Sequence, residues 1–434
     1  MAVKTPVYLD NNATTPIDPR VLEAMLPYLS QFYGNAASRS HAIGEKAATA
    51  VDTARGQVAA LIGAADKEIV FTSGATESDN LAIKGVAEMH RDRGNHIITA
   101  ATEHKAVLDT CRHLAGCGFD VTVLPVDGHG LVSPEQVAEA ITDRTILITV
   151  MAANNEIGTI HPIAEIGAVA KARGVLFHTD ATQAAGKVPI DVEAMGIDLL
   201  SLSAHKIHGP KGIGALYVRR RGPRVRLAIQ MHGGGHERGM RSGTLNVPGV
   251  VALGAAADIC QREMPDEGRR LTGLRDRLHE RLTAGLDHVT LNGHPTRRLP
   301  NTVNLSFAYV EGEALMLKMP HVAVSSGSAC TSASLEPSFV LRALGVGDEL
   351  AHSSIRFSLG RFTTVEEIDY AAEQVISAVH DLRELSPLYE MAREGVDISQ
   401  ADWSAGGTVP AAPAGGTEST GCGPDCCAKD DGGA

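Results

Sequence analysis

Lys206 is the residue whose type and setting point most directly to chemistry. It stands in the run Ser201-Leu-Ser-Ala-His-Lys-Ile-His208, directly after a short apolar stretch. Lysines are mostly exposed, and a desolvated lysine loses its charge readily and becomes a nucleophilic amine. Such an amine can form a Schiff base with pyridoxal phosphate. For Lys206 alone, a surface lysine between a strand and a loop is the better interpretation, so the rest of the chain must supply the other parts of such a site.

Three further polar residues are suited to holding the ring of that cofactor. Asp180 ends the apolar run 175–180, where a carboxylate can pair with a protonated pyridine nitrogen. Asn155 and Gln183 carry amides that can hydrogen-bond the phenolic oxygen of the ring. The structural alternative for Asp180 is an N-cap.

The order of strands and helices predicts that these residues meet. Strand-like apolar runs alternate with helical periodicity over residues 65–220, which predicts an α/β fold with a mostly parallel sheet covered by helices on both faces. His104, Asn155, Asp180 and Lys206 each follow one of the strands, and ligands of open α/β sheets bind at this edge. We therefore expect the four to converge, although a lone histidine such as His104 is more often structural.

Two segments are suited to binding an anion. Residues 72–78 join a strand to a helix through small residues, so that Ser73, Ala75 and Thr76 can offer backbone N–H groups to a phosphate. An ordinary N-cap with acidic residues in the first turn explains this segment equally well. The glycine-rich segment 231–244 contains two arginines and Thr244, which also suit an anion.

Two residues of the C-terminal half could act on a substrate. Cys330 lies in Ser325-Ser-Gly-Ser-Ala-Cys-Thr-Ser-Ala-Ser334, a small and polar run that is typical of an exposed loop and has no apolar face to bury a thiol. We therefore interpret Cys330 as reactive rather than as a buried small hydrophobe. Arg356, at the start of a strand, could clamp a substrate carboxylate, and a surface salt bridge is its alternative.

Composition narrows the class of protein. The 434 residues carry a net charge of -12, which argues against a nucleic-acid-binding surface as the main function. The longest apolar runs are shorter than a membrane span, and the N-terminus resembles neither a signal peptide nor a transit peptide, so we expect a cytoplasmic protein. Seven unevenly spaced cysteines do not form a disulfide framework.

We expect two domains and a tail. The large cofactor-binding domain spans residues 17–262, and the small α/β domain comprises residues 1–16 and 263–403, including the Cys330 loop. A helix from about Pro248 leads into a charged helix over 267–286 that connects the two. Residues 404–434 read as a disordered tail, in which Cys422, Cys426 and Cys427 give only a weak signal for metal binding or sulfur transfer.

Taken together, these segments resemble a known family, the cysteine desulfurases of the IscS/NifS group, within the aspartate-aminotransferase-like pyridoxal enzymes. The resemblance covers about residues 5–403 and is closest to the IscS branch. It is carried by Tyr8-Leu-Asp-Asn-Asn-Ala-Thr-Thr-Pro16, Phe71-Thr-Ser-Gly-Ala-Thr-Glu-Ser-Asp-Asn80, Thr102-Glu-His-Lys105, Asn154-Asn-Glu-Ile-Gly158, Asp180-Ala-Thr-Gln183, His205-Lys206, Gly233-Gly-Gly-His-Glu-Arg-Gly239 and Ser325-Ser-Gly-Ser-Ala-Cys-Thr-Ser332.

The resemblance implies a role for each candidate residue. Lys206 would be the Schiff-base lysine, Asp180 would pair with the pyridine nitrogen, and His104 would stack on the ring and assist proton transfers. Asn155 and Gln183 would face the ring oxygen. Arg356, together with Asn155, would bind the substrate carboxylate. The phosphate would be held by Ala75, Thr76, Ser203, His205 and, across a homodimer interface, Thr244 of the partner subunit.

The reaction implied by the resemblance is the release of alanine from L-cysteine. Cys330 would take the sulfur as a persulfide and pass it to an iron–sulfur scaffold protein or a tRNA-thiolation carrier. It could also ligate an iron–sulfur cluster shared with the scaffold. Two positions near the pocket depart from the family: Ala152 stands where close relatives often carry histidine, and His208 where many carry tyrosine.

Three other functions compete with this interpretation. An aminotransferase on the same scaffold needs no nucleophilic thiol, so the Cys330 loop argues against it. A selenocysteine lyase can be distinguished from a cysteine desulfurase only by comparing L-selenocysteine with L-cysteine as substrates. A non-catalytic assembly scaffold would not need Lys206, Asp180 and His104 together.

Overall fold

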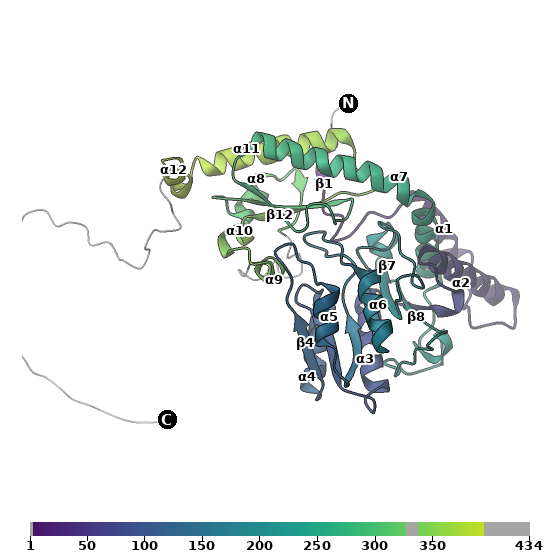
Figure 1. Cartoon of the computed structure of the whole chain (residues 1–434). Helices are drawn as coiled ribbons and strands as arrows, with labels where there is room; N and C mark the ends of the chain where they lie inside the picture. The colour runs from purple at the N-terminus through teal and green to yellow at the C-terminus, as the bar shows by residue number, and fades with distance from the viewer. Residues whose placement is uncertain (1–2, 327–336, 395–434) are drawn as a thin grey trace, which may run out of the picture. The chain divides into compact units, whose positions relative to one another are not determined.

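The computed structural model describes residues 3–326 and 337–394 (Figure 1). Its largest sheet has seven strands in the order β2–β8–β7–β6–β5–β3–β4. These strands are β2 (Ile69–Thr72), β3 (His96–Ala100), β4 (Asp120–Leu124), β5 (Thr145–Thr149), β6 (Leu176–Asp180), β7 (Leu199–Ser203) and β8 (Gly214–Val218). All neighbouring pairs are parallel except the two that involve β8. The predicted mostly parallel sheet is confirmed.

Helices cover both faces of this sheet. On one face α3 (Ala75–Met89) and α4 (Lys105–Gly116) pack against side chains such as Ile97 and Leu147. On the other face the neighbouring residues Ile98 and Ile148 pack under a second group of helices. That group consists of α1 (Pro19–Ser30), α2 (Ala42–Leu61), α5 (Pro134–Ala140), α6 (Ile163–Arg173) and the first part of α7 (Val247–Gly285). Successive strand residues point to opposite faces, so strands covered on both sides must be apolar throughout.

A smaller sheet has its own apolar core. Its strands, in the order β12–β10–β9, are antiparallel: β9 (Val289–Asn292), β10 (Thr302–Phe307) and β12 (Ser354–Ser358). Packed against it are the second part of α7, α8 (Gly312–Lys318) and α11 (Val365–Arg383). The two-stranded pair of β1 (Val7–Tyr8) and β11 (Val322–Ala323) adds Val7 and Val322 to the same core. The short helices α9 (Phe339–Ala343) and α10 (Asp348–His352) form a minor cluster around Ile157.

The helix α7 links the two cores. It runs for 39 residues without a break and contains Pro265, where the sequence predicts one helix leading into another. Its first part buries Leu253 and Ala257 in the core of the large sheet, and its second part buries Leu274 and Leu278 in that of the small sheet, alongside α11 (Figure 1). A proline removes one backbone hydrogen bond from a helix, and burial at both ends outweighs that loss here.

The described residues up to Ser386 form one compact unit, and the short helix α12 (Pro387–Arg393) belongs to a second. The division of the first unit into domains at residues 16 and 262 stays a prediction. None of the described helices is long and apolar enough to cross a membrane.

Candidate active site

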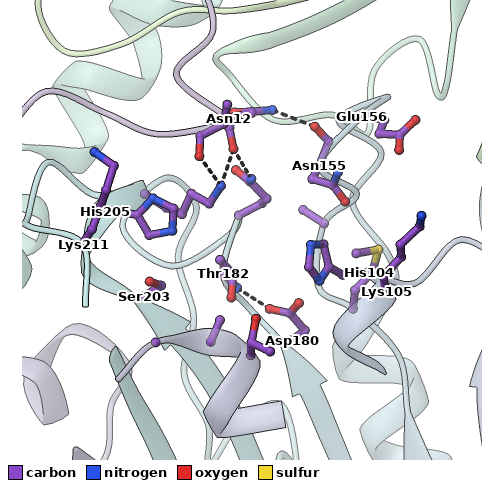
Figure 2. A pocket seen from close by; sticks show the side chains of 18 of the residues that line it. Asn12, His104, Lys105, Asn155, Glu156, Asp180, Thr182, Ser203, His205 and Lys211 are labelled. Atoms are coloured by element: carbon purple, nitrogen blue, oxygen red, sulfur yellow. Dashed lines mark hydrogen bonds between the residues drawn. The ribbon is translucent and has the colours of Figure 1, made fainter. Parts of the chain in front are cut away.

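The carboxyl ends of the parallel strands open into one cavity of about 600 Å³ (Figure 2). Its walls contain the candidate residues from widely separated segments of the sequence. These are Ala75, Thr76, His104, Asn155, Asp180, Gln183, Ser203, His205, Lys206 and Arg356. The predicted convergence of His104, Asn155, Asp180 and Lys206 at this edge is therefore confirmed.

Lys206 extends from the short turn after β7 toward the N-terminal segment. Its Nζ donates to the carbonyl oxygen of Asn12 at 2.5 Å and to that of Ala13 at 2.8 Å. Lys206 is thus partly buried and lines the cavity, which excludes the simple surface lysine as its interpretation. The amine is held by neutral carbonyl oxygens at the edge of the cavity, where a carbonyl compound can reach it.

Asp180 ends β6 and points into the cavity (Figure 2). It is 5% exposed, and its Oδ1 accepts a hydrogen bond from the backbone N–H of Thr182 at 2.8 Å. The buried acids Asp79 and Glu103 lie near it, and burial first, then the charge of Asp180, raises their pKa values well above the usual range. Asp180 is therefore the member of this acidic group that faces the cavity.

The two histidines lie on opposite sides of the cavity in Figure 2. His104 caps α4, because its Nδ1 accepts from the backbone N–H of Ala106 at 3.1 Å. It therefore has the structural role that the sequence left open and also lines the cavity. His205 bonds through Nδ1 to Thr14 Oγ1 at 3.2 Å. Burial and then the charge of Lys206 lower the pKa of His205 to about 4, so it is neutral at pH 7.

Arg356 enters from β12 of the small sheet and is 2% exposed. One terminal nitrogen donates to Asp10 Oδ1 at 2.8 Å, and the other donates to the carbonyl oxygen of Asn155 at 2.9 Å. Its Nε is buried without a hydrogen-bond partner among the described residues. Since a buried donor without a partner costs free energy, an acceptor from a ligand at this end of the cavity would satisfy it.

The N-terminus of α3 forms an anion-binding end of the cavity. Gly74 stands at the N-cap position, and no side chain caps the helix there. The first N–H groups of α3 therefore lie beside Thr76 and Ser203 with the positive end of the helix dipole. An added Cβ on Gly214 of β8 would come within 2.7 Å of Gly74 Cα, so glycine at 214 is what lets the strand approach this turn.

Comparison with known proteins decides the family. Residues 7–371 match the aminotransferase class-V family. The chain belongs to this family. It is 60% identical over 402 residues to the cysteine desulfurase IscS of Anaeromyxobacter sp. (strain Fw109-5), covering 93% of this chain and 99% of the relative. Its identity to the cysteine desulfurase IscS of Azotobacter vinelandii is 60% over 405 residues, 93% of this chain and 100% of the relative.

Solved structures agree with this assignment. A NifS-like protein with 39% identity superposes with a TM-score of 0.80 over 86% of this chain and 99% of its own. The structure of SspA in complex with cysteine is 41% identical, with a TM-score of 0.73 over 82% of this chain and 99% of that chain. The resemblance inferred from the motifs is confirmed, and with it an enzyme that uses pyridoxal phosphate.

The cavity of this class-V enzyme fits that cofactor. The uncapped helix N-terminus at Gly74 suits the phosphate, and the buried carboxyl group of Asp180 suits a ring nitrogen. Lys206 lines the cavity, with its amine donating to the carbonyl oxygens of Asn12 and Ala13. The roles of the individual residues stay predictions.

Among the described candidate residues, Thr244 does not line the cavity. Thr244 is exposed, so its contact with the phosphate of a partner subunit stays a prediction. Cys330 lies outside the described residues, as do the three cysteines of the tail. The two arginines of the glycine-rich segment bond within the chain: Arg238 donates to the carbonyl oxygen of Ile69, and Arg241 pairs with Glu77.

The two departures from the family lie around the cavity and not in its walls. Ala152 borders a separate, mostly apolar cavity of about 420 Å³. His208 borders a small hollow behind Lys206, where its Nδ1 bonds to the carbonyl oxygen of Pro16 at 3.0 Å. We expect neither substitution to change the residues that face a ligand.

Sequence reasoning missed several residues of the cavity, above all Asn12 and Glu156. The side chain of Asn12 bridges the two sheets by donating to the carbonyl oxygen of Asn155 at 3.1 Å and to Thr302 Oγ1 at 2.9 Å. Glu156 is 4% exposed and accepts from the hydroxyl of Ser338 at 2.5 Å. The only signal for both was their place inside the motifs at residues 8–16 and 154–158.

Glu156 should make stability depend on pH. Burial raises the pKa of its carboxyl to about 7, above the value of about 4.3 in an unfolded chain. The folded chain then holds a proton that the unfolded chain has released, so this contribution to stability is lost as pH rises from about 4.3 to about 7. The free energy of unfolding of the wild type should fall by on the order of 1–3 kcal/mol between pH 5 and pH 8, and Glu156→Gln should not show this fall. Urea denaturation at the two pH values measures the difference.

The matched control is Glu139→Gln, an exposed glutamate on α5. It should keep the pH dependence of the wild type. An identical change between pH 5 and pH 8 in Glu156→Gln and the wild type would show that Glu156 does not titrate in this window.

Proposed function

We propose that the chain is a cysteine desulfurase that converts L-cysteine to L-alanine and a persulfide on Cys330. The observation that carries this proposal is a single cavity with a lysine, a buried aspartate and a buried arginine, in a chain 60% identical to proteins named cysteine desulfurase IscS. The amino-acid substrate needs a carboxylate partner, and Arg356 with its unpartnered Nε is suited to that task.

The residues of the cavity divide the work. Bound there, pyridoxal phosphate supplies an electron sink for the bonds at the α-carbon of the substrate. Lys206 holds the cofactor through its amine, and Asp180 keeps the ring nitrogen protonated. His104 and Lys206 move protons, and Asn155 and Gln183 orient the ring oxygen. Ala75, Thr76, Ser203, His205 and Thr244 of the partner subunit hold the phosphate.

The sulfur leaves by attack of a thiolate. Cys330, as thiolate, forms an S–S bond with the substrate sulfur while the C–S bond of the substrate breaks. The electron pair of that bond stays on the substrate carbon, which takes up a proton and leaves as alanine. A second thiol then attacks the persulfide, and the outer sulfur passes to an acceptor.

We further propose the setting of this reaction. The enzyme is a homodimer in the cytoplasm, and its sulfur acceptors are an iron–sulfur scaffold protein and a tRNA-thiolation carrier. Cys330 also serves as a ligand of a [2Fe–2S] cluster while that cluster is shared with the scaffold. The name IscS of the relatives supports the iron–sulfur scaffold as an acceptor. We propose no part for nucleic acid or a membrane in this reaction.

Product analysis tests the function. Purified enzyme given L-cysteine and a thiol should release equal amounts of alanine and sulfide, and without the thiol it should carry a persulfide on Cys330. Cys330→Ala should release neither product above about 1% of the wild-type rate, because the sulfur has no nucleophile to receive it. Cys117→Ala, an exposed thiol at the end of α4, is the control and should match the wild type.

Two outcomes would favour a competing function. Turnover of Cys330→Ala at the wild-type rate with formation of a keto acid would indicate an aminotransferase. A kcat/KM for L-selenocysteine that exceeds the value for L-cysteine by orders of magnitude would indicate a selenocysteine lyase.

A further inference from the structure

A second lysine, Lys187, is connected to Lys206 through hydrogen bonds. It lies in the turn after β6 and is half-buried. Its Nζ donates to Gln183 Oε1 at 2.7 Å, and Gln183 Nε2 donates to the carbonyl oxygen of Asn12 at 3.0 Å. The same oxygen accepts from Lys206 Nζ at 2.5 Å. An uninterrupted chain of three hydrogen bonds thus joins the two amines, and Figure 2 shows its part at Asn12.

Lys187 determines which way the amide of Gln183 points. A protonated lysine has only donors to offer, so the amide must turn its oxygen toward Lys187. Its NH₂ group then faces the carbonyl oxygen of Asn12 and the cavity, which Gln183 lines. Without Lys187 only the Asn12 carbonyl would favour this orientation, so the two amide orientations would differ less in free energy. The hydrogen bond from Gln183 to the Asn12 carbonyl would then be less well fixed. The position of the oxygen that accepts from Lys206 would be less well fixed with it.

The residues around Lys187 indicate that it does not serve to form a simple ion pair. Lys187 and Lys206 border the same small hollow of about 20 Å³, together with Cys260, Glu267 and Arg361. Glu267 is the acid of this group, and its Oε2 already pairs with Arg361 at 2.8 Å.

The other groups around Lys187 add no negative charge. Burial raises the pKa of the Cys260 thiol to about 11, and burial lowers that of His208 to about 4, so both are neutral at pH 7. Arg356 adds a further positive charge, and burial followed by Lys206 lowers the pKa of Lys187 itself to about 7. At pH 7 Lys187 is therefore protonated in only part of the molecules, and this protonated form lies among cations at a free-energy cost that a surface lysine would not have.

We propose that Lys187 is a positioning residue of the active site, which orients the amide of Gln183 and through it the Asn12 carbonyl that holds Lys206. The amide then offers a donor, and not an acceptor, to the ring oxygen of the bound cofactor. This inference rests on the proposed function, because it assigns Gln183 to that ring oxygen. Lys187 acts only through Gln183 and touches no substrate.

The test is a double-mutant cycle on the cofactor-loaded enzyme. Wild type, Lys187→Met, Gln183→Ala and the double variant are titrated with pH, and the midpoint of the change in the visible absorption of the bound cofactor is recorded. Lys187→Met should shift the equilibrium constant of this transition about three- to tenfold, the effect of one hydrogen bond. In the Gln183→Ala background the same substitution should shift it less than about twofold, because the two residues act as one unit.

Two further variants keep the test decisive if Lys187→Met folds poorly. Lys187→Arg keeps the donor and should restore the wild-type midpoint. Gln183→Glu accepts from Lys187 but cannot donate to Asn12, so it should shift the midpoint although Lys187 is intact. The proposal is overturned if Lys187→Met has no effect on the midpoint, or if its full shift persists in the Gln183→Ala background. Alanine release by the wild type is measured separately, so failure of the proposed function is recognised independently of this cycle.

Discussion

Lys206→Ala should lose turnover of L-cysteine by about 10⁴-fold and release its cofactor on gel filtration. The amine anchors the cofactor covalently and transfers protons at the substrate carbon, and a positioned acid–base group alone contributes about 10²–10⁴-fold. Lys206 Nζ donates to the carbonyl oxygens of Asn12 and Ala13, and the loss of a donor costs neutral acceptors such as these less than it would cost a charged partner. The fold should therefore be retained. Absorbance of the desalted protein and alanine release measure the two effects.

The control for this prediction is Lys171→Ala, an exposed lysine near the end of α6. It should keep cofactor content and turnover. If Lys206→Ala kept the cofactor through denaturation and turned over at the wild-type rate, Lys105 and Lys211 would be the next candidates for the covalent link, because both line the same cavity.

Asp180→Asn should reduce kcat by about 10²–10³-fold and change KM for L-cysteine much less. The substitution keeps the shape of the side chain and an oxygen for the N–H of Thr182, but it removes the charge that pairs with the ring nitrogen. Loss of one preorganised electrostatic partner typically costs this amount. Since Arg356 is the expected partner of the substrate carboxylate, binding of the substrate should persist. Steady-state kinetics separate the two parameters.

A second measurement on the same variant tests the buried acids below it. The charge of Asp180 contributes to the raised pKa values of Asp79 and Glu103, so both values should fall in Asp180→Asn. Asp143→Asn, an exposed residue, is the control and should leave kcat unchanged. A fall in kcat/KM caused by KM alone would contradict the electrostatic role.

Much of the site could be predicted from the sequence, because the order of strands and helices shows which residues directly follow a strand. In a parallel sheet every strand ends at the same edge, so residues directly after the strands must meet whatever the details of packing. His104, Asn155, Asp180 and Lys206 follow four strands, and all four line the cavity. The small residues between β2 and α3 also indicated an anion site, but an ordinary N-cap explained them equally well, and only the structure shows Gly74 at the N-cap position without a side-chain cap.

Tertiary structure decided which residues outside this edge complete the site. Hydrogen bonds between residues 143 to 346 positions apart in the sequence hold Asn12, Glu156 and Arg356 in the cavity. The periodicity of a sequence gives no information on such distant contacts. The continuity of α7 through Pro265 likewise depended on two cores, since local propensity favours a break there.

Lys187 shows the difference most clearly. As a letter in the sequence it is a polar residue in a turn, for which a solvated amine is the ordinary interpretation. Only the folded chain places its amine against the Gln183 amide and beside Lys206. Local sequence indicated the strands of the large sheet and which groups lie at their ends. The packing of the small sheet and the N-terminal segment against that edge decided which of these groups are buried, paired and held in one orientation, because burial and long-range hydrogen bonds exist only in the assembled structure.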